Sequence, residues 1–233
     1  MCAGHKQKGS RGSAKMSMGF DFPPGLGSDN HSGVHPDILE ALSSVNTGHA
    51  PAYGMDPVTQ KAVEVFRTEL SSKAEIFFVF NGTAANVLAL KAKIRSHHAV
   101  ICSDVSHLQT DECGAPEAQI GCKLLPVPTK NGKLQVQDLQ RLMVRRGDQH
   151  ASQPAALSLT QPTELGTVYS LHELQELVEF AKDHQLWVHM DGARLANAAH
   201  FLQTTLKDLV RGVDVLSLGG TKNGLLGAEA VIF

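Results

Sequence analysis

The chain has 233 residues, enough for one large domain or two small ones. Hydrophobic residues make up 42% and charged residues 19%, which is the composition of a globular protein. A formal net charge of -2 gives no bulk attraction to nucleic acid or to an anionic membrane, and no apolar run reaches the roughly 18 residues of a membrane-spanning helix. We therefore expect neither nucleic-acid nor membrane partners.

The cysteine pattern and the N-terminal residues bear on location. The four cysteines contain no Cys-x-x-Cys pair, which argues against a zinc ribbon or a dithiol redox site. Reduced cysteines and the lack of an apolar signal-peptide core favour a cytoplasmic location. Residues 1–18 are rich in Gly, Ser and Lys without periodicity, so we expect a disordered leader followed by a single domain over residues 19–233.

Two helices are predicted early in the chain. Residues 21–33 read as a loop because of their Pro, Gly, Ser and Asn content. A proline then opens a helix over 36–44, and a second proline, capped by Asp56, opens another over 57–70.

From residue 75 onward, apolar runs alternate with helical patterns. The runs that predict strands cover 76–80, 99–102, 124–127, 155–159, 186–190, 213–218 and 230–233. The helices between them are expected over 82–94, 137–144, 170–181 and 195–200. This alternation predicts an α/β fold, a mostly parallel sheet with helices on both faces, and ligands of such sheets bind beyond the carboxyl ends of the strands. The last run, at the end of the chain, is expected to leave an unpaired strand edge.

Lys222 follows the strand predicted over 213–218 and a pair of glycines. Glycines allow the backbone to approach other groups closely. A lysine held at the end of a buried strand loses water, which lowers its pKa and makes its amine available to a carbonyl group. A surface lysine after a tight turn remains the alternative for this stretch alone.

Three other strand ends carry candidate ligand-binding residues. Gly82 and Thr83 open a helix, where free N–H groups and the helix dipole favour a phosphate, although an ordinary glycine helix entry would look the same. Rossmann and P-loop glycine motifs are both lacking. His107 can stack on a flat ring or move a proton, whereas a metal site with Asp111 and Glu112 lacks a known zinc spacing.

Asp191 closes the strand predicted over 186–190, and a carboxylate buried there needs a cationic partner. Arg194 is one candidate partner and a protonated ring nitrogen is the other. A phosphate cradle, a stacking histidine, a buried aspartate and a desolvated lysine on adjacent strand ends together suit pyridoxal 5′-phosphate. The lysine would form the Schiff base, and the aspartate would keep the pyridine nitrogen protonated.

Seven stretches resemble a known family, in the same order. They are SDN (28–30), AYG (52–54), FNGTAAN (80–86), HLQTDECGAP (107–116), QPTELGTVY (161–169), HMDGAR (189–194) and GGTKNG (219–224). They look like the threonine aldolases, β-eliminating lyases among the fold-type I pyridoxal-phosphate enzymes. The resemblance implies a fold-type I large domain and retro-aldol cleavage of threonine or allo-threonine to glycine and an aldehyde, a reaction of amino-acid metabolism.

The resemblance also implies residue roles. Lys222 matches the lysine that carries the cofactor, and Asp191 matches the partner of its pyridine nitrogen. Gly82 and Thr83 match the turn that binds its phosphate. His107 matches the imidazole that stacks on its ring, and it is also our first candidate for the base that takes the substrate's hydroxyl proton.

Substrate contacts follow from the same resemblance. Ser28 and Arg194 match residues that bind the substrate carboxylate, and Arg194 also matches a contact to the cofactor's ring oxygen. Glu164, acting through a water, is the second candidate base, and some family members carry a histidine at its position. No metal is implied.

The family continues beyond this stretch into a smaller C-terminal domain. The chain therefore resembles a fragment or truncated isoform. A non-catalytic chain that at most binds the cofactor or pairs with a full-length subunit is the alternative. Family members are dimers or tetramers with sites at subunit boundaries, so Tyr53 could serve a neighbouring subunit's site.

Overall fold

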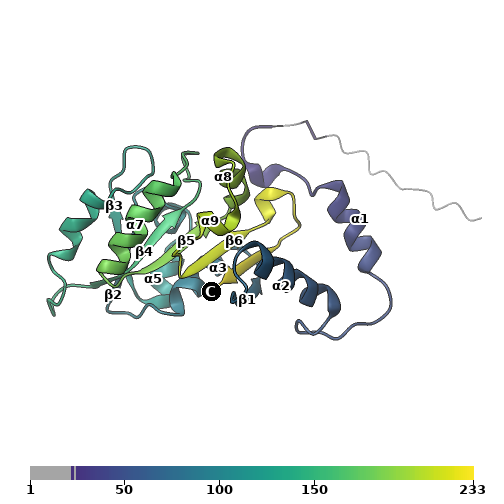
Figure 1. Ribbon diagram of the computed structural model, residues 1–233, viewed down its shortest axis with the longest axis horizontal. Helices are drawn as coiled ribbons and strands as arrows, with labels where there is room; N and C mark the ends of the chain where they lie inside the picture. The colour runs from purple at the N-terminus through teal and green to yellow at the C-terminus, as the bar shows by residue number, and fades with distance from the viewer. Residues whose placement is uncertain (1–21, 24) are drawn as a thin grey trace, which may run out of the picture.

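The computed structural model describes residues 22–23 and 25–233, so the predicted leader lies outside the described residues. A seven-stranded sheet forms the centre, in the order β1-β7-β6-β5-β4-β2-β3 (Figure 1). Its strands are β1 (Ile76–Val79), β2 (His98–Ser103), β3 (Lys123–Val127), β4 (Gln153–Thr160), β5 (Trp187–Gly192), β6 (Val215–Gly219) and β7 (Glu229–Ile232). The pairs from β6 to β3 are parallel, and β7 runs antiparallel to both neighbours. The prediction of a mostly parallel sheet is confirmed.

Helices cover both faces of this sheet. On one face, α3 (Gly82–Lys91) packs Ala85 and Ala89 against Val215 and Val231, because small side chains let the helix lie close to the strands. The short helices α4 (His107–Thr110) and α5 (Ala115–Ile120) complete this layer. The opposite face carries the largest apolar core, under α6 (Val136–Leu139), α7 (Leu171–Asp183), α8 (Leu195–Leu202) and α9 (Leu206–Leu209).

The capping signals in the sequence set the starts of several helices. The helices α1 (Pro36–Val45) and α2 (Pro57–Glu69) both begin at the predicted prolines, and Asp56 accepts the Thr59 N–H at 2.8 Å. The capping box of α7 is formed, since Ser170 Oγ accepts the Glu173 N–H at 3.2 Å and the Glu173 carboxylate accepts the Ser170 N–H at 2.7 Å. No helix among the described residues is long and apolar enough to cross a membrane.

Three predicted elements differ from the structure. The strand expected over 76–80 ends at Val79 and lies at the sheet edge, where Phe77 and Phe78 remain 52% and 47% exposed. The helix expected over 137–144 is α6 followed by a 3-10 turn, Gln140–Met143. The helix expected over 82–94 already ends at Lys91. Helices of four to six residues such as α4, α5 and α9 were missed, because they are too short to show a full apolar period.

The prediction of an unpaired C-terminal strand is wrong. β7 lies between β1 and β6 and pairs with both, so that Glu229 aligns with Val79 on one side and Gly219 on the other. Apolar periodicity identifies a strand but not its neighbours, which is why the sequence did not reveal this insertion. Because β7 is antiparallel to β1 and β6, its first residue, Glu229, lies beside the carboxyl ends of these two strands.

Candidate active site

A cavity of about 400 Å³ lies at the carboxyl ends of β4, β5 and β6. All the predicted site residues except Ser28 line it, namely Gly82, Thr83, His107, Glu164, Asp191, Arg194 and Lys222. Ser28 instead caps the 3-10 turn Asp29–His31, where its hydroxyl accepts the Asn30 N–H at 3.2 Å. The two residues on which the cofactor prediction depends most, Lys222 and Asp191, thus share one cavity.

The turn that carries Lys222 is closely packed. A Cβ atom added at Gly219 would lie 2.8 Å from Ala193 Cα, and one added at Gly220 would lie 2.8 Å from the Ala228 carbonyl oxygen. The Asn223 side chain fastens the turn by donating to the carbonyls of Ala193 and Gly219, at 3.0 and 3.1 Å. Lys222 follows on the 3-10 turn Thr221–Asn223, where it is half-buried. The glycine pair therefore permits a close backbone approach, as the sequence predicted.

Adding a single methyl group at Gly220 is expected to destabilise the fold. Gly220→Ala would push a Cβ into Ala228 and Leu225, and such overpacking costs about 1–3 kcal/mol. Gly33→Ala is the matched control, because a Cβ there meets nothing within 4 Å and should change the free energy of unfolding by less than about 0.5 kcal/mol. Urea unfolding of both variants measures the difference, and equal stabilities would contradict the close packing.

Asp191 is a buried carboxylate that forms no ion pair within the described part of the chain. It is 6% exposed, and it accepts hydrogen bonds from the Asn86 side chain at 2.9 Å and from the Ala193 N–H at 3.0 Å. Arg194, the alternative partner considered from the sequence, pairs with Asp29 instead, with Nη2 3.0 Å from Oδ1. Asp191 forms no salt bridge within residues 22–23 and 25–233.

The neighbouring histidine does not balance that charge either. His189 lies two residues before Asp191 on β5, fully buried, with Nδ1 2.9 Å from Ser158 Oγ. Burial lowers the pKa of His189 to about 4, so its ring is neutral at pH 7. Asp191 is hydrogen-bonded only to neutral donors within the described residues, and its environment consequently suits a ligand that brings its own positive charge, such as a protonated pyridine nitrogen.

The start of α3 lies at the cavity. Asn81 caps the helix, with its side chain accepting the Ala84 N–H at 2.8 Å and its carbonyl accepting the Ala85 N–H at 3.0 Å. The N–H groups of Gly82 and Thr83 precede these bonds, and both residues line the cavity. First-turn donors with the positive end of the helix dipole favour an anion such as a phosphate.

His107 is the first residue of α4, and its side chain is one-third exposed. Its Nδ1 lies 2.9 Å from Glu112 Oε1, and Asn86 of α3 donates to that same oxygen at 2.7 Å. Hydrogen bonding to Glu112 raises the pKa of His107 above its ordinary value of 6.5, against a smaller opposing effect of burial. The metal alternative finds no support, since the described part of the chain contains no cluster of three His, Cys, Asp or Glu residues arranged to hold an ion.

Glu164 lies in the loop between β4 and α7. Its Oε1 accepts the His107 N–H at 2.7 Å and the Thr160 hydroxyl at 3.0 Å, while Oε2 is buried and has no hydrogen-bond partner among the described residues. Burial raises the pKa of this carboxyl above its ordinary value. Glu164 therefore takes up a proton more readily than an exposed glutamate does, which suits a group that exchanges protons with a ligand.

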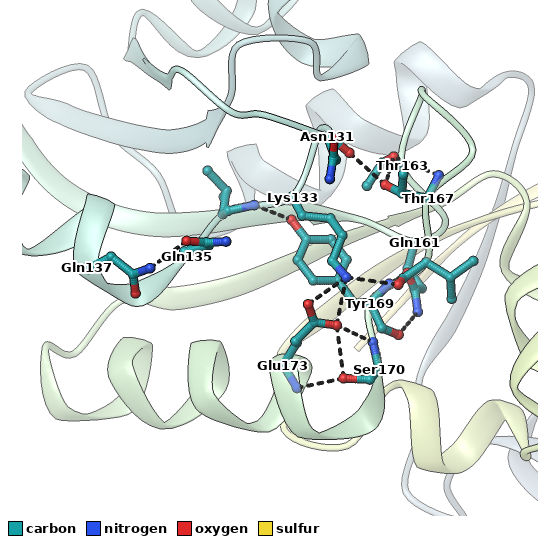
Figure 2. A network of polar contacts seen from close by, with 12 residues as sticks. Asn131, Lys133, Gln135, Gln137, Gln161, Thr163, Thr167, Tyr169, Ser170 and Glu173 are labelled. Atoms are coloured by element: carbon teal, nitrogen blue, oxygen red, sulfur yellow. Dashed lines mark hydrogen bonds and ion pairs between the residues drawn. The ribbon is translucent and has the colours of Figure 1, made fainter.

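A polar network holds the loop of Glu164 in place (Figure 2). Gln161 and Tyr169 at the two ends of the loop exchange hydrogen bonds at 2.9 and 3.0 Å, and Thr167 reaches the Asn131 carbonyl at 2.6 Å. The buried Tyr169 hydroxyl in turn accepts the Leu134 N–H at 2.7 Å. The loop is thus fixed by its own side chains, which keeps Glu164 beside His107.

Three polar residues of this region were not predicted to act at the site. Asn86 and Glu112 are 2% and 3% exposed and link His107 to Asp191, and Glu229 lines the cavity while accepting the Thr221 hydroxyl at 2.7 Å. Two sequence signals were available, because Asn86 is a polar residue on the otherwise apolar face of α3 and both Asn86 and Glu112 lie within stretches that resemble the family. Glu229 was not identified as a cavity residue because the position of β7 between β1 and β6 was not predicted.

The chain is similar to known proteins in both sequence and fold. Residues 25–233 match the family model described as Beta-eliminating lyase. The low specificity L-threonine aldolase of Pseudomonas aeruginosa is 45% identical over 216 residues, which cover 91% of this chain and 62% of that protein. The solved threonine aldolase of Leishmania major superposes with a TM-score of 0.83 at 33% identity, covering 88% of this chain and 60% of that one.

A more distant structure is similar in fold alone. The aromatic aminotransferase of Pyrococcus horikoshii has a TM-score of 0.65 at 18% identity, with 86% of this chain and 56% of that chain covered. The chain spans about three fifths of the length of the threonine aldolases it matches.

Proposed function

Because the chain belongs to the β-eliminating lyase family, whose cofactor is pyridoxal 5′-phosphate, we propose that the protein cleaves the Cα–Cβ bond of β-hydroxy amino acids. The substrates would be threonine or allo-threonine, and the products glycine and an aldehyde. The observation that carries the proposal is a cavity that joins Lys222, the start of α3 and a buried Asp191 that has no salt-bridge partner among the described residues. The similarity to two threonine aldolases supports the choice of reaction.

Four residues would hold the cofactor in this proposal. The Lys222 amine would bind its aldehyde carbon, and the backbone N–H groups of Gly82 and Thr83 would bind its phosphate. Asp191 would hold a proton on the pyridine nitrogen, and the Asn86 and Ala193 donors would keep the carboxylate in place. When bound, the cofactor supplies an electron sink for the substrate bond that breaks.

Arg194 would orient the substrate by its carboxylate. Asp29 engages the Nε and Nη2 atoms of Arg194, which leaves Nη1 for a carboxylate and keeps the guanidinium in a fixed orientation. A fixed carboxylate sets the angle of the Cα–Cβ bond, which is the orientation effect in catalysis. Ser28 is kept as a second contact on the family resemblance, although it does not line the cavity.

Proton transfer would fall to His107 and Glu164. We assign the removal of the substrate's hydroxyl proton to His107, which lines the cavity, and keep Glu164 as the alternative base, acting through a water. A cytoplasmic location and a dimeric or tetrameric assembly, in which Tyr53 serves the neighbouring site, belong to the same proposal.

Glycine release from L-threonine and L-allo-threonine is the test of this function. The purified 233-residue chain, supplied with pyridoxal phosphate, should form glycine and acetaldehyde in equal amounts. Formation of 2-oxobutanoate and ammonia in place of glycine and acetaldehyde would indicate β-elimination, a different reaction on the same fold.

A non-catalytic role is the second candidate, because the chain spans only about three fifths of its relatives. It predicts a cofactor absorbance band without glycine release, and release by this chain would contradict it. Adding a full-length relative tests whether pairing restores turnover.

A further inference from the structure

We propose that Glu112 and Asn86 are positioning residues for His107, fixing its ring so that Nδ1 carries a proton and Nε2 is left as the proton acceptor. The inference deepens the proposed function and rests on it for its consequence in catalysis. The orientation of the His107 ring depends only on the protein's own side chains, so it can be tested separately from the proposed threonine cleavage.

Among the described residues, His107 is the one ionisable side chain that is hydrogen-bonded to Glu112. Its side chain is fully buried, and Oε1 accepts from His107 Nδ1 at 2.9 Å and from Asn86 Nδ2 at 2.7 Å. Its other oxygen, Oε2, is buried and accepts no hydrogen bond from residues 22–23 or 25–233. A carboxylate accepts but does not donate, so the nitrogen facing it must carry the hydrogen, which assigns Nδ1–H to His107.

Asn86 joins this pair to the other buried carboxylate. Its Nδ2 donates to Glu112 Oε1 at 2.7 Å and to Asp191 Oδ2 at 2.9 Å, whereas its Oδ1 is buried and has no partner in the part of the chain that the structure describes. An amide can serve two carboxylates at once without adding charge, and each side chain restrains the next. The orientation of His107 is thereby tied, through α3, to the carboxylate proposed to hold the pyridine nitrogen.

The charged groups around His107 come from several elements. Glu112 and Asp191 both raise its pKa, and Lys222 lowers it. Glu164 accepts the His107 backbone N–H, and Asp111 and Arg194 line the same cavity. Glu112 has the largest influence, so removing its charge should lower the His107 pKa, although the remaining groups stay in place.

Nitrogen-detected NMR of the histidine rings in the full chain, without added cofactor, tests the assignment. A His107→Asn variant identifies the His107 signals among those of the 12 histidines. Above its pKa, His107 of the unaltered chain should show the Nδ1–H form. The Nε2–H form would overturn the proposal without requiring any variant to fold.

Glu112→Gln then tests the charge, because the amide keeps the shape of the side chain. The His107 pKa should fall relative to the unaltered chain, and the Nδ1–H form should become less populated. Glu117→Gln, on the exposed side of α5, is the control and should change neither. An unchanged titration and tautomer in Glu112→Gln would overturn the proposal.

The catalytic consequence follows if the chain cleaves threonine. His107 accepts a proton only in its neutral form, so kcat/KM should fall as pH drops through its pKa. In Glu112→Gln this acid limb should move to lower pH, while kcat/KM on the plateau falls roughly 10–100-fold. A lower plateau with an unmoved limb would mean that Glu112 has only a structural role.

Discussion

Lys222→Ala is expected to abolish both the borohydride-reducible absorbance of the bound cofactor and glycine release from threonine. Among the described residues that line the cavity, Lys222 is the one lysine, so its amine is the proposed covalent link to the cofactor's aldehyde carbon, and removal of a catalytic nucleophile lowers turnover by more than about 10³-fold. Lys222 is half-buried and forms no salt bridge within the described residues, so its truncation should leave the free energy of unfolding nearly unchanged.

Lys207→Ala is the matched control for this substitution. Lys207 is an exposed lysine on α9, outside the cavity, and its loss should leave the spectrum and the turnover unaltered. A reducible band of unchanged intensity in Lys222→Ala would mean that another amine carries the cofactor, and the assignment of the cavity would then be lost.

Asp191→Ala should separate cofactor binding from turnover. The phosphate donors at Gly82 and Thr83 and the amine of Lys222 would remain, so part of the cofactor should still bind. Without the Asp191 carboxylate, a bound pyridine nitrogen would no longer be held in its protonated form and would draw electrons less strongly, so we expect turnover to drop by about 10²–10³-fold. Absorbance and glycine release, measured on the same sample, give the two quantities.

A stability measurement accompanies this variant. Loss of the carboxylate removes one of the two acceptors of the buried Asn86 amide, which should cost about 1–3 kcal/mol of unfolding free energy. Asp183→Ala, at the exposed end of α7, provides the control for both measurements. Normal turnover in Asp191→Ala would show that the electron sink is not built as proposed.

Local sequence signals determined much of the fold because they act within a few residues. The prolines at the starts of α1 and α2, the capping box at Ser170 and the apolar runs of the central strands all satisfy their requirements within a single element. The carboxyl ends of parallel strands lie at the same end of a sheet, so the sequence alone predicted that Asp191 and Lys222 lie close together there.

The remaining features depend on contacts between distant residues. The Asn86–Asp191 hydrogen bond spans 105 positions, and no local pattern encodes which carboxylates a buried amide will meet. Arg194 pairs with Asp29, which is 165 positions away in the sequence. The sequence had suggested Asp191 as the partner of Arg194, because the two residues are close in the chain. Glu229 reached the cavity only because β7 inserts between β1 and β6, which its four apolar-rich residues do not specify.

Identification of the lysine that carries the cofactor tests the central claim most directly. The chain would be incubated with pyridoxal phosphate, reduced with borohydride, digested, and its peptides sequenced by mass spectrometry. We predict that the reduced pyridoxyl group is found on Lys222. Its recovery on any other lysine, with Lys222 unmodified, would contradict the account.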